Sequence, residues 1–200
     1  YDPDYEKAKA LGQKFNISVF KDPAEAAAIQ NCIFDLAIPP SAHHKVLELI
    51  PENSAVILQK PMGSNLSEAS NILTLCRKKS LNACVNFQLR FAPMMIALKD
   101  IINKGLIGEI VDIDMWAALD TPWNLWKFLE DLPRVEILLH SIHYFDAIRF
   151  LVGNPHGVHA KTMGHPASKI SNTRTAAILD YGEDLRCAVS INHNHNYGRK

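Results

Sequence analysis

The first half of the chain alternates short apolar runs with segments of helical periodicity, and this alternation constrains the fold more than any other feature. The runs are 33–38, 55–58 and 82–87. Runs this short indicate buried strands rather than helices, and we expect the run 55–58 to be buried on both faces of its sheet. The alternation therefore predicts a mostly parallel sheet with helices on its faces.

The segments around these runs complete the expected first domain. We expect helices over 4–14, 43–50 and 66–78, and a brief strand at 19–20 before a short helix that starts near residue 23.

After Phe87 the pattern changes to longer strands joined by a hairpin turn at 181–184. We expect helices over 94–104 and 134–152, and strands over 109–119, 157–163, 174–181 and 185–192. The predicted fold class is α/β: a partial Rossmann doubly wound parallel sheet over residues 1–87, followed by an α+β domain with a mixed, largely antiparallel open sheet over residues 88–200.

Composition excludes several classes of protein. The 21 basic and 21 acidic residues balance, so no charge excess indicates nucleic acid or an anionic membrane surface as partner. No apolar stretch approaches the roughly 18 residues of a membrane span. Cys32, Cys76, Cys84 and Cys187 form no C-x-x-C pair, so we expect reduced core cysteines in a cytoplasmic protein.

The two ends of the chain suggest a piece of a longer protein. The sequence begins with Tyr1 rather than methionine, and it stops at residues 199–200, just past a predicted strand. We expect further sequence on both sides.

Lys60 is the first candidate for chemistry. It stands two residues past the run 55–58, after Gln59, and the carboxyl ends of parallel strands are where α/β sheets bind their ligands. Pro61 fixes the backbone on one side of it. The alternative is a strand-end lysine whose ammonium reaches water.

The predicted helix 134–152 carries the second candidates. At 100° per residue, Glu136, His140 and His143 share one face of a helix that is apolar nearly all round. Buried histidines need partners or line a cavity, and the alternative is a purely structural role. Asp146 and Arg149 have the spacing of an ordinary helix ion pair.

Zinc is a rival interpretation of this face. His140, His143 and Glu136 are suitable zinc ligands, yet no cysteine or histidine motif elsewhere completes a site. The segment 193–195 is expected to be a solvated edge. We therefore predict no metal.

A lysine at a sheet edge and a buried histidine together suit proton transfer at a hydroxyl or carbonyl oxygen. Histidine titrates near neutral pH, and burial lowers the pKa of a lysine. Oxidation of an alcohol to a carbonyl is a natural use, with a cofactor accepting the hydride. Arg90, Trp123 and Trp126 are candidate substrate residues, because aromatic faces and a guanidinium suit sugar hydroxyls; plain packing is the alternative for the tryptophans.

Several segments in order resemble the Gfo/Idh/MocA oxidoreductases. They are Pro-Pro-Ser-Ala-His at 39–43, Gln-Lys-Pro at 59–61, the stretch 140–153, Phe-Gln-Leu-Arg-Phe at 87–91 and Gly-Leu-Ile-Gly-Glu-Ile at 105–110. The resemblance implies a Rossmann domain that binds NAD or NADP, joined to a domain whose open sheet serves in homo-oligomer contact. It also implies a small hydroxylated substrate.

The resemblance assigns roles to residues. It implies catalysis by Lys60 and His143; His140, on the same predicted helical face as His143, is a third catalytic candidate. It implies that an acidic residue at the position of Asp2 binds the adenosine ribose and favours NAD over NADP. The residues it places at the cofactor are Asp2, Pro39, Pro40, His43, Gln59, Lys60 and Pro61.

Three departures from the family pattern stand out. The sequence contains no G-x-G-x-x-G loop, which would bind the pyrophosphate. Gln59 replaces the usual glutamate, and Leu139 occupies a position where many members have aspartate. Glu136 or His140 is a hypothetical replacement for that aspartate.

The sequence therefore favours an NAD(P)-dependent oxidoreductase acting on a sugar, polyol or related hydroxy compound. Two alternatives stay open: a non-catalytic binding or regulatory member of the family, which Gln59 and Leu139 favour, and a structural oligomerisation domain.

Overall fold

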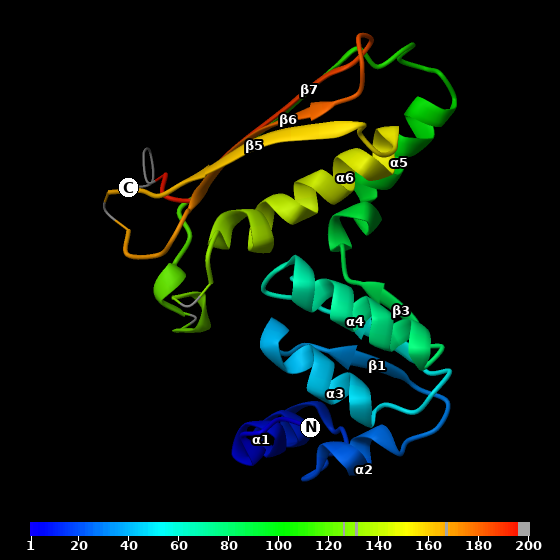
Figure 1. Ribbon diagram of the computed structural model, residues 1–200. Coiled ribbons are helices and arrows are strands. Elements are labelled where there is room, and N and C mark those ends of the chain that lie inside the picture. The colour runs from blue at the N-terminus through cyan, green and yellow to red at the C-terminus, as the bar shows by residue number, and fades with distance from the viewer. Residues whose placement is uncertain (126, 131, 167, 196–200) are drawn as a thin grey trace. The chain divides into compact units, whose positions relative to one another are not determined.

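The computed structural model describes residues 1–125, 127–130, 132–166 and 168–195. It separates into two compact units, unit 1 over Tyr1–Asn86 and unit 2 from Phe87 onward, each with its own sheet (Figure 1). No helix within the described ranges is long and apolar enough to span a membrane.

Unit 1 is a three-stranded parallel sheet in the order β1-β2-β3 with helices between the strands. Parallel strands require crossover connections, and helices supply them. The elements are α1 (Tyr5–Phe15), α2 (Pro23–Ala27), β1 (Ile33–Leu36), the 3-10 turn η1 (Pro40–Ala42), α3 (His43–Leu49), β2 (Ala55–Leu58), α4 (Leu66–Lys78) and β3 (Asn82–Val85).

The core of unit 1 lies between one face of this sheet and the helices α3 and α4. Val56 and Leu58 of β2 and Leu36 of β1 pack there against Leu47 and Ile72 of the two helices. Because successive side chains of a strand point to opposite faces, this alternation leaves the other sheet face outside the core.

Three expectations about unit 1 are wrong. The run 55–58 is buried on one face only, since Ala55 and Ile57 are half-exposed. Residues 19–20 form no strand. Cys84 is exposed, because it projects from β3 on the side opposite Ala83, which packs on the core.

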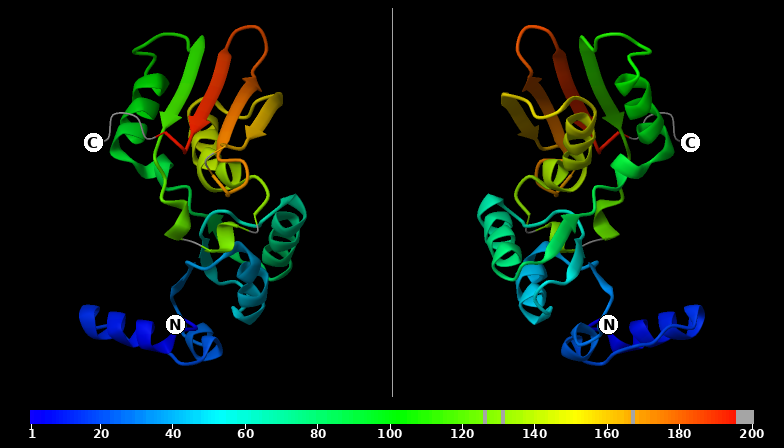
Figure 2. Two further views of the ribbon diagram at one scale, coloured as in Figure 1. Left: turned by 90° about the vertical axis from the view of Figure 1, so that its left-hand side faces the viewer. Right: turned by 90° about the vertical axis from the view of Figure 1, so that its right-hand side faces the viewer.

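Unit 2 contains a four-stranded mixed sheet in the order β4-β7-β6-β5 (Figure 2). Strands β5, β6 and β7 pair antiparallel, and β4 pairs parallel with β7, which confirms the predicted mixed sheet and the hairpin at 181–184. The elements are η2 (Gln88–Phe91), α5 (Pro93–Asn103), β4 (Asp112–Ala118), η3 (Trp123–Leu125), η4 (Lys127–Leu129), η5 (Ile137–Ser141), α6 (Ile142–Val152), β5 (Gly157–Met163), β6 (Arg174–Asp180) and β7 (Arg186–Asn192).

Helix α6 covers one face of this sheet. Ile148 of α6 packs with Leu179 of β6 and Val189 of β7 in the main core of unit 2. A smaller apolar cluster contains Trp123 and Leu139. The opposite sheet face exposes two large apolar side chains, those of Trp116 and Ile178.

The segment before α6 differs from the predicted regular helix. Ile137–Ser141 is one π-helical stretch, and α6 starts at Ile142. A π-helix has more residues per turn than an α-helix, so the 100° step does not apply across it. The step on which the shared face of Glu136, His140 and His143 was predicted therefore does not hold across this stretch, and tertiary contacts decide where each side chain goes.

Candidate active site

Lys60 lies just beyond β2, at the edge of the unit 1 sheet where all three parallel strands end. Its side chain is half-buried, and desolvation lowers the pKa of its ammonium below the ordinary value of 10.5. The peptide bond between Lys60 and Pro61 is cis. A lysine of this kind has a larger unprotonated fraction near neutral pH than one in water, which suits proton transfer.

Gln59 is held by hydrogen bonds to a residue of β1 and to the residue that follows β3. Its Nε2 donates to Asp35 Oδ1 at 2.9 Å, and its Oε1 accepts from Asn86 Nδ2 at 3.1 Å. This pattern uses the donor and the acceptor of the amide together, so the residue beside Lys60 has a defined position.

His43 is fully buried under the same edge of the sheet. Its ring nitrogens lie 3.1 Å from the carbonyl oxygen of Met62 and 3.4 Å from that of Leu36. The ring therefore links the end of β1 to the loop after Lys60. These contacts show that His43 has a structural role at this edge, and its contact with a cofactor stays a prediction.

The other residues expected at the cofactor differ in accessibility. Pro40 and Pro61 are buried, whereas Pro39 and Asp2 are exposed. Asp2 Oδ1 accepts a hydrogen bond from the backbone of Asp4 at 2.8 Å. Of the two prolines in the loop after β1 that were predicted to contact the cofactor, Pro39 is therefore the one that is accessible from solvent.

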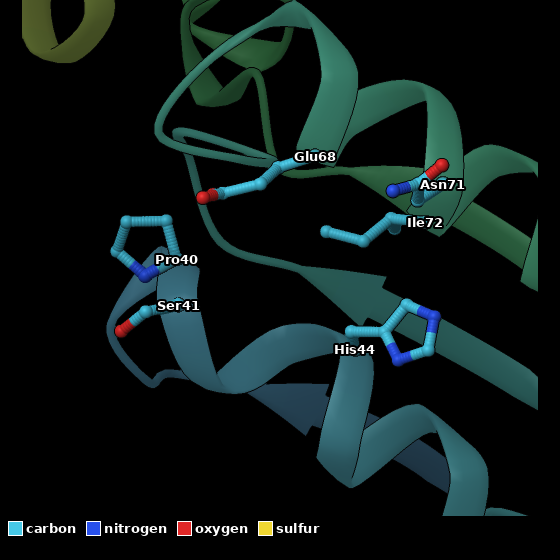
Figure 3. Close-up of a pocket in the computed structure, with 6 residues that line it drawn as sticks. All are labelled: Pro40, Ser41, His44, Glu68, Asn71 and Ile72. Carbon is cyan, nitrogen blue, oxygen red and sulfur yellow. The ribbon is translucent and has the colours of Figure 1, made fainter.

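A cavity of about 360 Å³ opens between the start of α3 and the first half of α4 (Figure 3). Glu68 is fixed beside it, because its Oε2 accepts from the backbone of Ser64 at 2.8 Å and the backbone of Glu68 donates to Asn65 Oδ1 at 2.9 Å. Pro40, Ser41, His44, Glu68, Asn71 and Ile72 line the cavity.

His143 lies in the first turn of unit 2's helix α6 and is 8% exposed. Its ring meets the ring of Phe87 edge-on, with centroids 6.1 Å apart and planes at 85°. The prediction that His143 is buried is confirmed, but its aromatic neighbour Phe87, at the start of unit 2, was not predicted.

Glu136, His140 and His193 form a second, deeper cluster in unit 2. The His140 and His193 rings stack with centroids 4.0 Å apart, and His193 Nε2 lies 3.7 Å from Glu136 Oε1. The Ser141 hydroxyl donates to the Glu136 carboxylate at 2.8 Å, and burial raises the pKa of that carboxyl above its usual range. His193 is 1% exposed, so the expectation of a solvated edge at 193–195 is wrong.

Trp123 belongs to the packing of this cluster. Its Nε1 donates to the carbonyl oxygen of His193 at 3.3 Å, and its ring lies edge-on to that of His140, with centroids 5.4 Å apart. At 8% exposed, the side chain is packed in this cluster, and its predicted contact with substrate stays a prediction. Trp126, the other candidate tryptophan, lies outside the described residues.

Arg90 and Asp146 form a bidentate ion pair within unit 2. Arg90 Nε and Nη2 donate to the two carboxylate oxygens, each at 2.6 Å. Asp146 is 3% exposed, and its hydrogen bond raises the pKa of the Arg90 guanidinium. Arg149 instead donates to Asn154 at 2.8 Å, so the predicted helix pair between Asp146 and Arg149 is wrong.

Within the described ranges, no group of three or more histidine, cysteine, aspartate or glutamate side chains is arranged to hold a metal ion. The side chains that sequence analysis missed are Phe87, Asp146 as a partner of Arg90, and His193. Asp146 follows His143 by three residues, which puts the two on one helical face; that spacing was the signal available in the sequence.

Comparison with known proteins gives two family matches along the chain. The oxidoreductase family model with NAD-binding Rossmann fold matches residues 1–87, and the GFO/IDH/MocA C-terminal domain model matches residues 95–200.

Curated relatives are distant. A D-apiose dehydrogenase of Paraburkholderia graminis is 26% identical over 186 residues, which cover 89% of this chain and 48% of that protein. The trans-1,2-dihydrobenzene-1,2-diol dehydrogenase of Mus musculus is 29% identical over 110 residues, covering 54% and 33%. The chain thus spans about half the length, or less, of these relatives.

Solved structures share the fold. An oxidoreductase from Agrobacterium radiobacter, in complex with NAD+, L-tartaric acid and magnesium, superposes with a TM-score of 0.82 at 23% identity, covering 100% of this chain and 59% of that one. The WlbA dehydrogenase of Bordetella pertussis, in complex with NADH and UDP-GlcNAcA, gives a TM-score of 0.79 at 18% identity, covering 98% and 59%. Both family models match in order along one sequence, and the chain belongs to the Gfo/Idh/MocA family of oxidoreductases.

Proposed function

We propose that this protein is an NAD(P)-dependent dehydrogenase or reductase acting on a CH–OH group of a sugar, polyol or related hydroxy compound. The observation that carries the proposal is the half-buried Lys60, with its lowered pKa, at the carboxyl edge of the parallel sheet. Family membership supports it, as do relatives named D-apiose dehydrogenase and dihydrodiol dehydrogenase.

The residues at this edge fit a nicotinamide dinucleotide in their chemistry. Pro39 is exposed, and Gln59 and Lys60 are half-exposed beside it at the ends of β1 and β2. These three would hold the nicotinamide half, with NAD slightly favoured by the acidic Asp2. When bound, the cofactor supplies the acceptor or donor of the hydride.

Lys60 and His143 would handle the proton of the substrate oxygen. Desolvation lowers the pKa of Lys60 and so favours the neutral amine, which would accept the hydroxyl proton during oxidation and return it during reduction. The imidazole of His143 acts as an acid or base at the same kind of oxygen, and its burial limits competing exchange with water.

The first experiment tests cofactor binding. The full-length natural protein is titrated with NADH and with NADPH, and nicotinamide fluorescence is recorded. A saturable signal with one dinucleotide is expected, with NADH the tighter. A lack of saturation with both would contradict the proposal and favour the non-catalytic alternative.

The second experiment tests the two residues. Turnover of a panel of sugars, polyols and dihydrodiols is measured for Lys60→Ala and for His143→Asn, and each is expected to lose about 100-fold or more in kcat. Lys45→Ala and His156→Asn, which change exposed residues of the same types in the same units, are the matched controls. Wild-type turnover in either test variant would remove that residue from the mechanism.

One observation favours the non-catalytic alternative. Leu139 stands where many family members have aspartate, and its side chain is buried in the cluster with Leu129, Leu132 and Val135. A site that lacks this carboxylate suits a binding or regulatory protein that retains the cofactor. Saturable NADH binding without turnover of any hydroxylated compound would favour this alternative.

We further propose that the protein is a cytoplasmic homo-oligomer. The outer face of the unit 2 sheet exposes Trp116 and Ile178 at 69% and 57%. An apolar face of this kind marks an interaction surface, and the cysteines are free thiols. Light scattering of wild type and Ile178→Lys tests this: the variant is expected to dissociate, and an unchanged mass would exclude the surface.

A further inference from the structure

We propose that Phe87 and Arg90 are positioning residues that fix the orientation of the His143 ring through a two-point contact between η2 and α6. The proposal rests on the proposed function, because it concerns the residue assigned there to acid–base chemistry. Every contact involved lies within unit 2.

The first half of the argument is the geometry of η2. The backbone N–H of Arg90 donates to the carbonyl oxygen of Phe87 at 3.1 Å, which closes one 3-10 turn. Phe87 is the N-cap of η2, one residue before the 3-10 backbone begins, and this turn brings its side chain and that of Arg90 to the same helix, α6.

Helix α6 presents residues at the same spacing. His143 and Asp146 are three apart in an α-helix, so they lie on one face. Phe87 contacts His143, with ring centroids 6.1 Å apart, and Arg90 binds Asp146 through two hydrogen bonds of 2.6 Å. The two elements thus meet at two points whose spacing matches.

The Arg90 contact supplies the rigidity. A bidentate guanidinium–carboxylate pair fixes orientation as well as distance, because two parallel hydrogen bonds restrict rotation. Asp146 is 3% exposed, and Arg90 also lies over the ring of Phe150, 5.5 Å from its centroid. Arg90 therefore holds η2 against α6 through two residues: Asp146, one turn beyond His143, and Phe150, two turns beyond it.

The Phe87 contact restricts the His143 imidazole, because Phe87 is adjacent to η2, which Arg90 holds in place. With η2 fixed, the Phe87 ring stands edge-on to the His143 ring at 85° and limits its rotation about χ2. A displacement of a catalytic group by about 1 Å can cost on the order of 100-fold in rate. The pair therefore raises the fraction of His143 in the productive orientation.

The test compares kinetics with a direct signal from His143. The variants of the full-length protein are Phe87→Leu, Phe87→Tyr and Arg90→Lys, with Phe91→Leu and Arg186→Lys as controls. Phe91 is 73% exposed on the same 3-10 turn, and Arg186 makes a bidentate pair with Asp112 on the surface. Histidine is labelled with carbon-13, and His143→Asn assigns the signal.

We expect Phe87→Leu and Arg90→Lys to lower kcat by about 10-fold to 100-fold. KM and the NADH dissociation constant stay near wild type. The His143 ring resonances shift in both variants, because the ring current of Phe87 is lost or displaced. Phe87→Tyr retains an aromatic ring, so its kcat and its His143 resonances stay near those of wild type. The two control variants also resemble wild type.

Three outcomes would overturn the proposal. They are a wild-type kcat in both Phe87→Leu and Arg90→Lys, a loss of kcat with unshifted His143 resonances, and a Phe87→Tyr variant whose kcat and resonances differ from wild type as much as those of Phe87→Leu. If Phe87→Leu does not fold, Arg90→Lys and the resonances decide. If the wild type neither binds NADH nor turns over, the proposed function fails, while the shifts still report whether Phe87 and Arg90 position the ring.

Discussion

The side-chain amide of Gln59 donates to the Asp35 carboxylate at 2.9 Å, directly beside Lys60. The same amide accepts from Asn86 at 3.1 Å. A glutamate here has no hydrogen to donate to Asp35 while it is ionised. The departure from the usual family glutamate therefore has a local physical reason: the neighbour of Gln59 is itself a carboxylate.

We predict that Gln59→Glu destabilises the fold at neutral pH by about 1 kcal/mol, because one hydrogen bond is lost and two carboxylates face each other. The loss should shrink near pH 4, where a protonated carboxyl can donate again. Urea unfolding at both pH values measures this, with the exposed Gln13→Glu as control. Equal stability of Gln59→Glu and wild type at pH 7 would refute it.

Arg90→Met should destabilise unit 2 by about 3 kcal/mol, because it leaves the buried Asp146 carboxylate without its guanidinium. Arg186→Met breaks an exposed pair of similar geometry, whose partner Asp112 can be hydrated, and should cost far less. Denaturant unfolding of both variants gives the comparison. Asp146→Leu added to Arg90→Met should recover stability; a further loss would mean that the charge is not the cause.

Glu136→Gln should make stability less dependent on pH. Burial raises the pKa of Glu136 in the folded state above the ordinary 4.5, so the folded state binds more protons above that pH. The stability of wild type relative to Glu136→Gln is therefore fully present below pH 4.5 and declines as pH rises through the folded-state pKa. Thermal unfolding from pH 4 to 8 measures the difference, and parallel curves would contradict the prediction.

For Lys60→Met, the stability difference from wild type should change with pH in the opposite direction to that of Glu136→Gln. Desolvation lowers the pKa of Lys60 below 10.5, so the unfolded state binds more protons between the folded-state pKa and 10.5. Wild type should gain stability relative to Lys60→Met as pH rises through this window. Urea unfolding from pH 7 to 10 tests it, with Lys45→Met as control; a constant difference would show that the ammonium is not desolvated.

Much of the fold follows from local sequence patterns. The run 55–58 became β2, residues 66–78 became α4, and the turn at 181–184 joins β6 to β7. Neighbouring residues determine these features, since strand length, helical periodicity and turn residues act over a few positions. The π-helical stretch Ile137–Ser141 escaped prediction, because the apolar pattern of 134–152 is that of a regular helix.

The sequence by itself determined that Lys60 ends a strand of a parallel sheet and that His143 lies on a buried helix. Only the tertiary structure decided which side chains surround them. Arg90 and Asp146 are 56 residues apart in the chain, and Gln59 and Asp35 are 24 apart. Periodicity carries no information about such pairs, because they form only when separate elements pack; the same packing buries His43 and His193, which a local pattern leaves open.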